Sequence, residues 1–388
     1  MFCYKVSGKF SPWRGRIVRR QNSSSAPVEA SSTTTLSPAL PVTVFSGIQP
    51  TGSLHLGNYF GAVKLWTEIQ NDPTKQLITS VVDMHAITLA WDPKALRANI
   101  RRMFIELLAC GVDPSKTVLF QQSQVPQHAQ LQWIFACLTT MARLDNLPQY
   151  KEKSATQSDI PCGLLLYPVL QAADILLYRA RLVPVGEDQV HHLQLAQHTA
   201  RVFNHHHGKL FPSPQRLPSD LPRVKSLREP AKKMSKSEPD TKSRIEVADS
   251  PEQIMLKCKR AVTDFPAEIT FDPETRPGIS NLLLLYKTIR AMEMDAVLEH
   301  FRAKDKVALK EELGEAVVEL LRPVRENVRH LEGNLEFVER VMEEGAEKAR
   351  ALAADTMRLV ENLVGFRSDV KSVKEMFKKP AKTAVAVG

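Results

Sequence analysis

Apolar positions recur along this chain with two alternating periods. Residues 42–45 are a β-branched and aromatic run that predicts a buried strand, whereas residues 59–69 have the three-to-four-residue spacing of a helix. The alternation continues to about Gln121, with further strands predicted at residues 76–82 and 117–120. Strands that alternate with helices indicate a parallel sheet covered by helices, so we expect an α/β fold.

A later apolar segment, residues 163–178, predicts a helix interrupted at Pro168, and a fourth strand follows at residues 182–185. Residues 211–222 are rich in proline and are predicted to form a loop. Beyond about residue 238 the apolar spacing is helical throughout. We therefore divide the chain into a segment 1–40, a parallel-sheet domain 41–237 with a helical insertion, a helical domain 238–370 and a basic tail 371–388.

The turn after the first strand has the features of a phosphate-binding corner. Gly47, Pro50 and Gly52 end the strand, and His55 to Asn58 open the next helix. Free backbone N–H groups and the helix dipole favour an anion at such a position. Gly57 would let a nucleotide approach the backbone, and His55 and Asn58 would add donors. The alternative is an ordinary turn with His55 as a solvated surface residue.

Further polar residues follow the second and fourth predicted strands. Asp83 and His85 end the second strand, and residues 186–189 read Gly-Glu-Asp-Gln after the fourth. Because ligands of parallel sheets bind at the carboxyl ends of the strands, we expect these residues near Gly47 and Gln49. The sequence contains no glycine-rich dinucleotide fingerprint and no P-loop, so neither of those nucleotide sites is supported.

One acidic residue, Asp174, falls within an apolar helical stretch, on the same face as Leu170 and Leu177. A carboxylate is costly to bury without hydrogen-bond partners, so Asp174 needs a partner. That partner is either a ligand or, as the alternative, a protein group such as Arg179 or Arg181.

The chain is basic, with a formal net charge of +9. This charge favours a polyanionic partner such as a nucleic acid. Residues 232–239 form a hydrophilic segment with several lysines, which either close on a polyphosphate or are solvated surface. The five cysteines are scattered, without a Cys-x-x-Cys pair, and no apolar run is long enough to span a membrane. His205 to His207 are more typical of solvated surface than of a metal site.

The first 40 residues differ in composition from the rest. They are basic and rich in serine, and the first acidic residue is Glu29. This composition is typical of a mitochondrial or plastid transit peptide, with a disordered basic arm as the alternative.

Three separated motifs now coincide: His-Leu-Gly-Asn at 55–58, Gly-Glu-Asp-Gln at 186–189 and Lys-Met-Ser-Lys-Ser at 233–237. This set resembles the class I aminoacyl-tRNA synthetases, whose signatures are His-Ile-Gly-His and Lys-Met-Ser-Lys-Ser. The phrases at residues 45–52, 163–178 and 183–189 resemble the bacterial-type tryptophanyl-tRNA synthetases, and segment 1–40 points to a mitochondrial form. The resemblance implies a Rossmann-like catalytic domain and a helical C-terminal domain that binds the tRNA anticodon.

The resemblance implies ATP-dependent activation of L-tryptophan, with magnesium carried on ATP, and transfer to tRNA(Trp). His55, Asn58, Lys153, Lys233 and Lys236 would be the catalytic residues. The ATP-binding residues would be Gln49, His55, Leu56, Gly57, Asn58, Gly186, Glu187, Asp188, Val224, Lys233, Met234, Ser235, Lys236 and Ser237. No general base is needed, because the amino acid's own carboxylate attacks the α-phosphate.

For tryptophan, Asp174 would accept the indole N–H, while Tyr167 and Gln189 would orient the α-amino group. The full set implied for tryptophan binding is Phe45, Gly47, His85, Tyr167, Gln171, Asp174, Val183, Val185 and Gln189. Gln171 departs from the methionine found in many tryptophan enzymes. Because Tyr167, Gln171 and Asp174 also match tyrosyl-tRNA synthetases, that specificity is one alternative, and a non-catalytic RNA-binding relative is another.

The resemblance also implies partners and a compartment. It indicates a homodimer in the mitochondrial matrix, with no resident zinc and no contact with a membrane. Arg325 and Arg329, on the basic C-terminal helices, would contact the tRNA by family analogy.

Overall fold

The computed structural model describes residues 41–154, 159–186, 189–218, 224–236 and 238–367, all of which belong to one compact unit. The segment interpreted as a transit peptide and the basic tail 371–388 lie outside the described residues. No helix in the described part of the chain has the length and apolar character that crossing a membrane requires.

A five-stranded parallel sheet forms the centre of the structure, in the order β3-β2-β1-β4-β5. The strands are β1 (Val42–Ile48), β2 (Lys75–Val81), β3 (Val118–Gln121), β4 (Leu182–Pro184) and β5 (Gln215–Leu217). The expected α/β fold with a parallel sheet is confirmed. Apolar residues of β1 and β2 are buried because helices cover the sheet, as parallel sheets require.

The strand β5 corrects the prediction of a loop over residues 211–222. Only Gln215 to Leu217 pair with β4, with Val183 opposite Arg216. Gln215 and Arg216 are exposed on this edge strand, so no apolar alternation marks it in the sequence.

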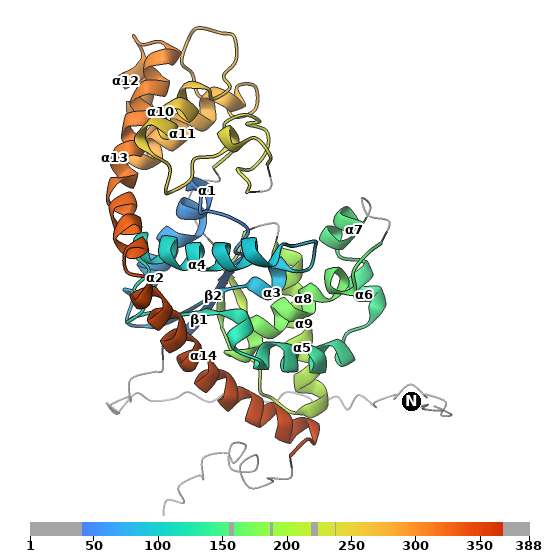
Figure 1. The fold of residues 1–388 in the computed structure, drawn as a ribbon. Coiled ribbons are helices and arrows are strands. Elements are labelled where there is room, and N and C mark those ends of the chain that lie inside the picture. Colours follow the sequence, from blue (N-terminus) through green and yellow to red (C-terminus); the bar gives the residue numbers. More distant parts are fainter. Residues whose placement is uncertain (1–40, 155–158, 187–188, 219–223, 237, 368–388) are drawn as a thin grey trace, which may run out of the picture. The chain divides into compact units, whose positions relative to one another are not determined.

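Helices fill most of the connections between the strands and predominate in the C-terminal part (Figure 1). In the first half they are α1 (Leu56–Asn58), the π-helix η1 (Tyr59–Val63), α2 (Lys64–Ile69), α3 (Asp83–Ala86), α4 (Pro93–Ala109), the 3₁₀ turn η2 (Gln122–Gln124), α5 (Gln127–Leu138), α6 (Met141–Asp145), α7 (Pro148–Ser154), α8 (Cys162–Leu177) and α9 (Val190–His207). The later ones are the 3₁₀ turn η4 (Thr241–Ser243), α10 (Pro251–Lys259), α11 (Pro277–Arg290), α12 (Met294–Phe301), α13 (Lys306–Glu332) and α14 (Leu335–Val364).

The predicted interruption at Pro168 is wrong, because α8 runs through this proline. A proline removes one hydrogen bond of the helix ladder. Apolar residues on both sides of it, such as Leu164 and Ala172, are completely buried. Tertiary packing of α8 against α5 and α9 therefore keeps the helix continuous.

The C-terminal helices pack on the sheet and its flanking helices. Helix α13 contacts α4, and α14 lies along β3 at the edge of the sheet. A Cβ atom at Gly345 of α14 would collide with the backbone carbonyl of Leu119 in β3. Only glycine allows this close approach of helix and strand. The division at residue 237/238 into a catalytic domain and a tRNA-binding domain stays a prediction.

Candidate active site

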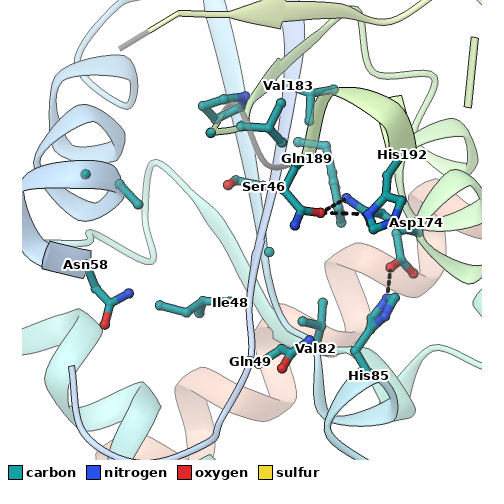
Figure 2. Close-up of a pocket in the computed structure, with 18 of the residues that line it drawn as sticks. Ser46, Ile48, Gln49, Asn58, Val82, His85, Asp174, Val183, Gln189 and His192 are labelled. Atoms are coloured by element: carbon teal, nitrogen blue, oxygen red, sulfur yellow. Dashed lines mark hydrogen bonds and ion pairs between the residues drawn. The ribbon is translucent and has the colours of Figure 1, made fainter. Parts of the chain in front are cut away.

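A cavity of about 770 Å³ opens at the carboxyl ends of β1 and β4 (Figure 2). Many of the residues predicted for the site line it, namely Phe45, Gly47, Gln49, Gly57, Asn58, His85, Tyr167, Gln171, Asp174, Val183, Val185, Gly186, Gln189, Val224 and Lys233. The cavity therefore brings together residues that are up to about 190 positions apart in the sequence, as the rule on strand ends predicts.

Some predicted residues cannot be placed from the described part of the chain. Glu187, Asp188 and Ser237 lie outside the described residues, and the side chain of Lys153 is also outside them. The remaining predicted residues lie on the turn after β1 or on residues 232–236, called here the lysine-rich segment. They are His55, Leu56, Met234, Ser235 and Lys236.

His55 is the N-cap of α1 and is buried, so the alternative of a solvated surface residue is wrong. Its Nδ1 accepts the Asn58 N–H at 3.2 Å, and the Asn58 side chain accepts the His55 N–H in return. Burial, followed by the positive charges of Lys236, Arg244 and Lys233, lowers the pKa of His55 to about 3. The ring is neutral at physiological pH, and its proton is on Nε2 because Nδ1 is an acceptor.

The glycine at position 57 has an additional role that the sequence did not indicate. A Cβ atom there would lie 2.9 Å from atoms of the His55 ring. Leu56 points away from the site into the core and is completely buried. The close approach of the His55 ring at Gly57 and the burial of Leu56 therefore both favour this conformation of the turn.

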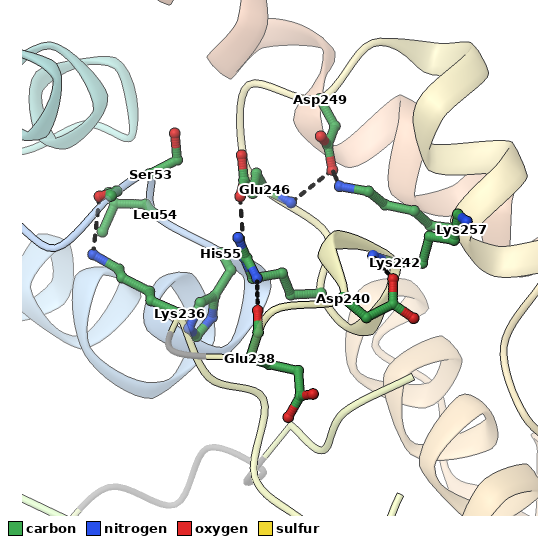
Figure 3. Close-up of polar contacts among 12 residues, drawn as sticks. Ser53, Leu54, His55, Lys236, Glu238, Asp240, Lys242, Glu246, Asp249 and Lys257 are labelled. Atoms are coloured by element: carbon green, nitrogen blue, oxygen red, sulfur yellow. Dashed lines mark hydrogen bonds and ion pairs between the residues drawn. The ribbon is translucent and has the colours of Figure 1, made fainter. Parts of the chain in front are cut away.

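The lysine-rich segment lies against this turn (Figure 3). The Lys236 Nζ donates to the carbonyl oxygen of Gly52 at 3.2 Å and lies 3.5 Å from that of Gln49. Burial lowers the pKa of Lys236 to about 8, although Glu106 and Glu246 oppose this effect. Backbone carbonyls thus hold the cation beside the predicted phosphate corner.

Backbone pairing joins the first signature to residues 245–247, which follow the second signature in the chain. The Leu56 N–H donates to Ile245 at 2.9 Å, and the Val247 N–H donates to Leu54 at 2.9 Å. Within the lysine-rich segment, Met234 is buried and donates its N–H to the Val224 carbonyl at 3.1 Å. Main-chain hydrogen bonds therefore hold residues 245–247 against the first signature, and the Met234 bond fixes the second signature on residue 224.

The other half of the cavity surrounds Asp174 of α8, which is 1% exposed. Its Oδ2 lies 2.8 Å from His85 Nε2, and its Oδ1 is contacted by Gln122 and His128. These partners are protein groups, as the alternative from the sequence allowed, but pairing with Arg179 or Arg181 is wrong. Burial alone would raise the pKa of Asp174, but hydrogen bonds from the two histidines hold it below the ordinary range.

Aromatic and polar groups complete this half of the cavity. The Phe45 ring stacks on Tyr178, with 5.6 Å between the ring centroids. Beside them, His192 Nδ1 lies 2.9 Å from the Gln189 Oε1, to which Gln171 also donates at 3.3 Å. The side chains of Gln171 and Gln189 thus contact each other in the lining of the cavity.

Four residues that contact these side chains were not predicted from the sequence: Gln122, His128, Tyr178 and His192. Gln122 follows β3 directly, so the rule that used the ends of β2 and β4 would also have drawn attention to it. His128, Tyr178 and His192 carry no local signal, since helix-borne histidines and tyrosines are common in ordinary cores. Among the described residues, no group of three or more His, Cys, Asp and Glu side chains is arranged to hold a metal ion.

Arg325 does not offer the surface contact to tRNA that its sequence position suggested. Its side chain is buried in α13 and donates to the Val318 carbonyl at 2.9 Å. Arg329, one turn later, is exposed.

Comparison with known proteins gives a consistent result. The family model "tRNA synthetases class I (W and Y)" matches residues 38–322. The chain is 43% identical to the tryptophan–tRNA ligase of Bacillus anthracis, over 83% of this chain and 97% of the relative. It is 45% identical to the mitochondrial tryptophan–tRNA ligase of Caenorhabditis elegans, over 84% of this chain and 92% of the relative.

A solved structure shows the same fold. The tryptophanyl-tRNA synthetase of Mycoplasma pneumoniae matches with a TM-score of 0.78 and 32% identity, over 85% of this chain and 99% of that one. Identity, coverage and fold agree. The chain belongs to the tryptophanyl-tRNA synthetases, class I aminoacyl-tRNA synthetases that join tryptophan to tRNA with the use of ATP.

Proposed function

We propose that this chain forms tryptophanyl-adenylate from L-tryptophan and MgATP in the cavity at the sheet edge, and then transfers the acyl group to tRNA(Trp). The single observation that carries the proposal is one cavity lined by the buried Asp174 carboxylate and the Phe45 ring and also by Lys233, with Lys236 held against the adjoining turn. An indole with one N–H donor suits the first end, and a triphosphate suits the second.

In the first step, a carboxylate oxygen of tryptophan attacks the α-phosphorus and pyrophosphate leaves. The enzyme aligns the two groups and neutralises the developing charge, so no general base is required. Gln49, His55 and Asn58 hold the triphosphate and ribose, with His55 donating from its neutral Nε2. Lys233 and Lys236 neutralise the leaving pyrophosphate. Magnesium enters as part of the nucleotide substrate.

The remaining nucleotide contacts are proposed from motif positions. Gly186, Glu187 and Asp188 line the ribose, and the Val224 backbone contacts adenine. Gly57, Ser235, Ser237 and Lys153 complete the ATP site. The side chains of Leu56 and Met234 are buried, so these two residues would contact the nucleotide through their backbone.

For the amino acid, Asp174 accepts the indole N–H, and Tyr167 and Gln189 orient the α-amino group. Phe45, Gly47, His85, Val183 and Val185 form the walls, with Gln171 at the rim. A site that hydrogen-bonds a ligand N–H rejects ligands without that group by about 10⁴–10⁵-fold, as known from another synthetase. Editing of mischarged tRNA is therefore unnecessary.

The test is amino-acid-dependent ATP–pyrophosphate exchange on the full chain, with tryptophan and tyrosine side by side. We expect exchange with tryptophan alone and its loss in Asp174→Ala. Exchange with tyrosine would show that Gln171 sets a different specificity. A folded protein that exchanges with neither amino acid would refute the proposed function.

We further propose that the protein works in the mitochondrial matrix, with residues 1–40 as its transit peptide. The relatives from C. elegans and Dictyostelium discoideum are named as mitochondrial enzymes, which supports this proposal. A fluorescent protein carrying residues 1–40 should become protease-protected inside isolated mitochondria. If it stays protease-sensitive, the segment is a basic arm with another role.

A homodimer is proposed as the working form. Trp133 of α5 and Met141 of α6 are 68% and 66% exposed, which is unusual for large apolar side chains. Light scattering should give about twice the chain mass of 43.5 kDa. A mass of one chain would contradict the proposal.

A further inference from the structure

The Asp174 carboxylate is held by three donors from three different elements. Gln122 Nε2 lies 2.7 Å from Oδ1 and His128 Nδ1 lies 2.6 Å from the same oxygen, while His85 Nε2 lies 2.8 Å from Oδ2. All four side chains are at most 7% exposed. Such a network is costly to bury, so it needs an explanation beyond the stability of the fold.

The amide of Gln122 can adopt only one orientation. Its Oε1 accepts the Met84 N–H of α3 at 3.1 Å, and a backbone N–H is always a donor. The NH₂ group of Gln122 must therefore face Asp174. The Met84 N–H therefore fixes the Gln122 NH₂ group as a donor to the Asp174 carboxylate.

His128 is fixed in the same manner from behind. Its Nε2 lies 2.9 Å from the Tyr178 hydroxyl. Burial raises the pKa of Tyr178 above its ordinary range, so the phenol keeps its proton. A neutral His128 satisfies both contacts when Nε2 accepts from Tyr178 and Nδ1–H donates to Asp174.

Counting acceptor sites shows what the network leaves open. A carboxylate has about four lone-pair sites, two on each oxygen. Gln122 and His128 use both sites of Oδ1, and His85 uses one site of Oδ2. Among the described residues, these donors leave one acceptor site open, on Oδ2, which His85 also contacts. The Asp174 side chain lines the cavity.

We propose that Gln122 and His128, with Tyr178 behind them, are positioning residues that present Asp174 to the amino-acid substrate as a fixed, acceptor-only group with one open site. This arrangement selects side chains that carry a ring N–H. The inference rests on the proposed function and adds to it the residues that set the selectivity.

The reason is electrostatic and geometric. A carboxyl group without these donors would rotate or take up a proton, and a protonated oxygen can donate to a ring that lacks N–H. With the three donors in place, a ligand without N–H leaves a buried lone pair unsatisfied. Selectivity therefore depends on groups that never touch the substrate.

The test compares tryptophan with 3-(3-benzothienyl)-L-alanine, which keeps the bicyclic shape and has sulfur in place of the N–H. ATP–pyrophosphate exchange with each gives a ratio of kcat/KM values. We expect Gln122→Met and His128→Leu to lower the tryptophan preference about tenfold or more, mainly through a higher KM for tryptophan. The KM for ATP should stay unchanged.

Two further variants separate positioning from structural support. His128→Asn keeps a donor near the position of Nδ1 and should restore most of the preference. Tyr178→Phe removes only the hydroxyl, should fold normally, and should lower the preference by about threefold. Thr199→Val, which deletes an equally buried hydrogen bond to Leu195 in α9, is the matched control and should leave the ratio at the wild-type value.

The outcomes distinguish failure of the positioning role from failure of the proposed function. If the wild-type chain exchanges with tryptophan but Gln122→Met, His128→Leu and Tyr178→Phe all keep the wild-type ratio, the positioning role is refuted and the proposed function stands. If the wild-type chain does not exchange with tryptophan, the positioning role and the proposed function are both refuted. A ratio lowered in Tyr178→Phe but not in Thr199→Val supports the positioning role even if the other two variants fail to fold.

Discussion

The amino-acid half and the nucleotide half of the site hold their charged groups by different physical means. The amino-acid half is a buried network in which three hydrogen-bond donors fix the Asp174 carboxylate. The nucleotide half consists of a turn and a lysine-rich segment, and the Lys236 ammonium is held there by backbone carbonyls.

The difference indicates how selectivity and rate are divided. A fixed network discriminates between similar side chains, because any mismatch leaves a buried group unpaired. A cation on a flexible stem can follow charge as it moves from the α-phosphate to pyrophosphate. We therefore expect variants in the first half to change selectivity for the amino acid and variants in the second half to change rate.

The largest expected effect is from Lys236→Met. Loss of this cation should lower kcat for exchange by about 10²–10³-fold, because charge on the leaving pyrophosphate is no longer neutralised. The KM for tryptophan should change little. Lys232→Met is the matched control, since Lys232 is an exposed lysine of the same segment that pairs with Glu229. Equal losses in both variants would show that only general charge matters.

The support beneath the turn gives a pH effect on stability. Glu106 of α4 accepts the Leu54 N–H at 2.6 Å, and burial raises its pKa from the ordinary value of 4.5 to about 7. Between these values the folded protein keeps a proton that the unfolded chain releases. The free energy of unfolding should therefore fall by about 3 kcal/mol in total as pH rises from about 4.5 to 7.

Glu106→Gln should remove this contribution, because an amide does not titrate in this range. Urea unfolding of both proteins at several pH values measures it as the difference between the two pH profiles. Parallel profiles would mean that Glu106 is ionised throughout. This variant tests the scaffold of the nucleotide half and should leave the selectivity for tryptophan unaltered.

The scaffold of the amino-acid half is tested at Gly345. A Cβ there would push α14 away from β3, the strand that leads into Gln122. Gly345→Ala should lower the free energy of unfolding by about 2 kcal/mol and raise the KM for tryptophan more than that for ATP. Gly163→Ala, where the nearest atom to an added Cβ is 3.9 Å away, is the control. Equal changes in the two KM values would remove the distinction between the halves.

The smallest effect concerns alkaline pH. Because burial lowers the pKa of Lys236 to about 8, its charge is lost above that pH. The kcat/KM for ATP, which reports the free enzyme, should be about tenfold lower at pH 9 than at pH 7. Lys236→Arg keeps its charge and should lack this decline. A decline of the same size in the arginine variant would assign it to another group.

The sequence predicted the parts of this structure that depend on local patterns. The parallel sheet followed from strand and helix periods, and the corner at His55 followed from glycines after a strand. An acid within an apolar stretch identified Asp174 as a buried group in need of partners. Each of these conclusions uses neighbours in the chain.

The residues that the sequence did not identify have roles that depend on neighbours in space. Gln122 and His128 are 52 and 46 positions from Asp174, so no spacing rule connects them. Glu106 looks like any polar residue of an amphipathic helix until the turn above it is known. Gly57 was predicted to make room for a ligand, but the nearby His55 ring also requires a glycine at this position.

The most direct test of the central claim is calorimetric binding of tryptophan, without nucleotide, to the wild-type chain and to Asp174→Asn. The amide keeps the size of the side chain and loses the charged acceptor. The account predicts that tryptophan binds about 100-fold more weakly to the variant, with unchanged affinity for ATP. Equal affinity of both proteins for tryptophan would contradict the assignment of Asp174 as the acceptor of the indole N–H.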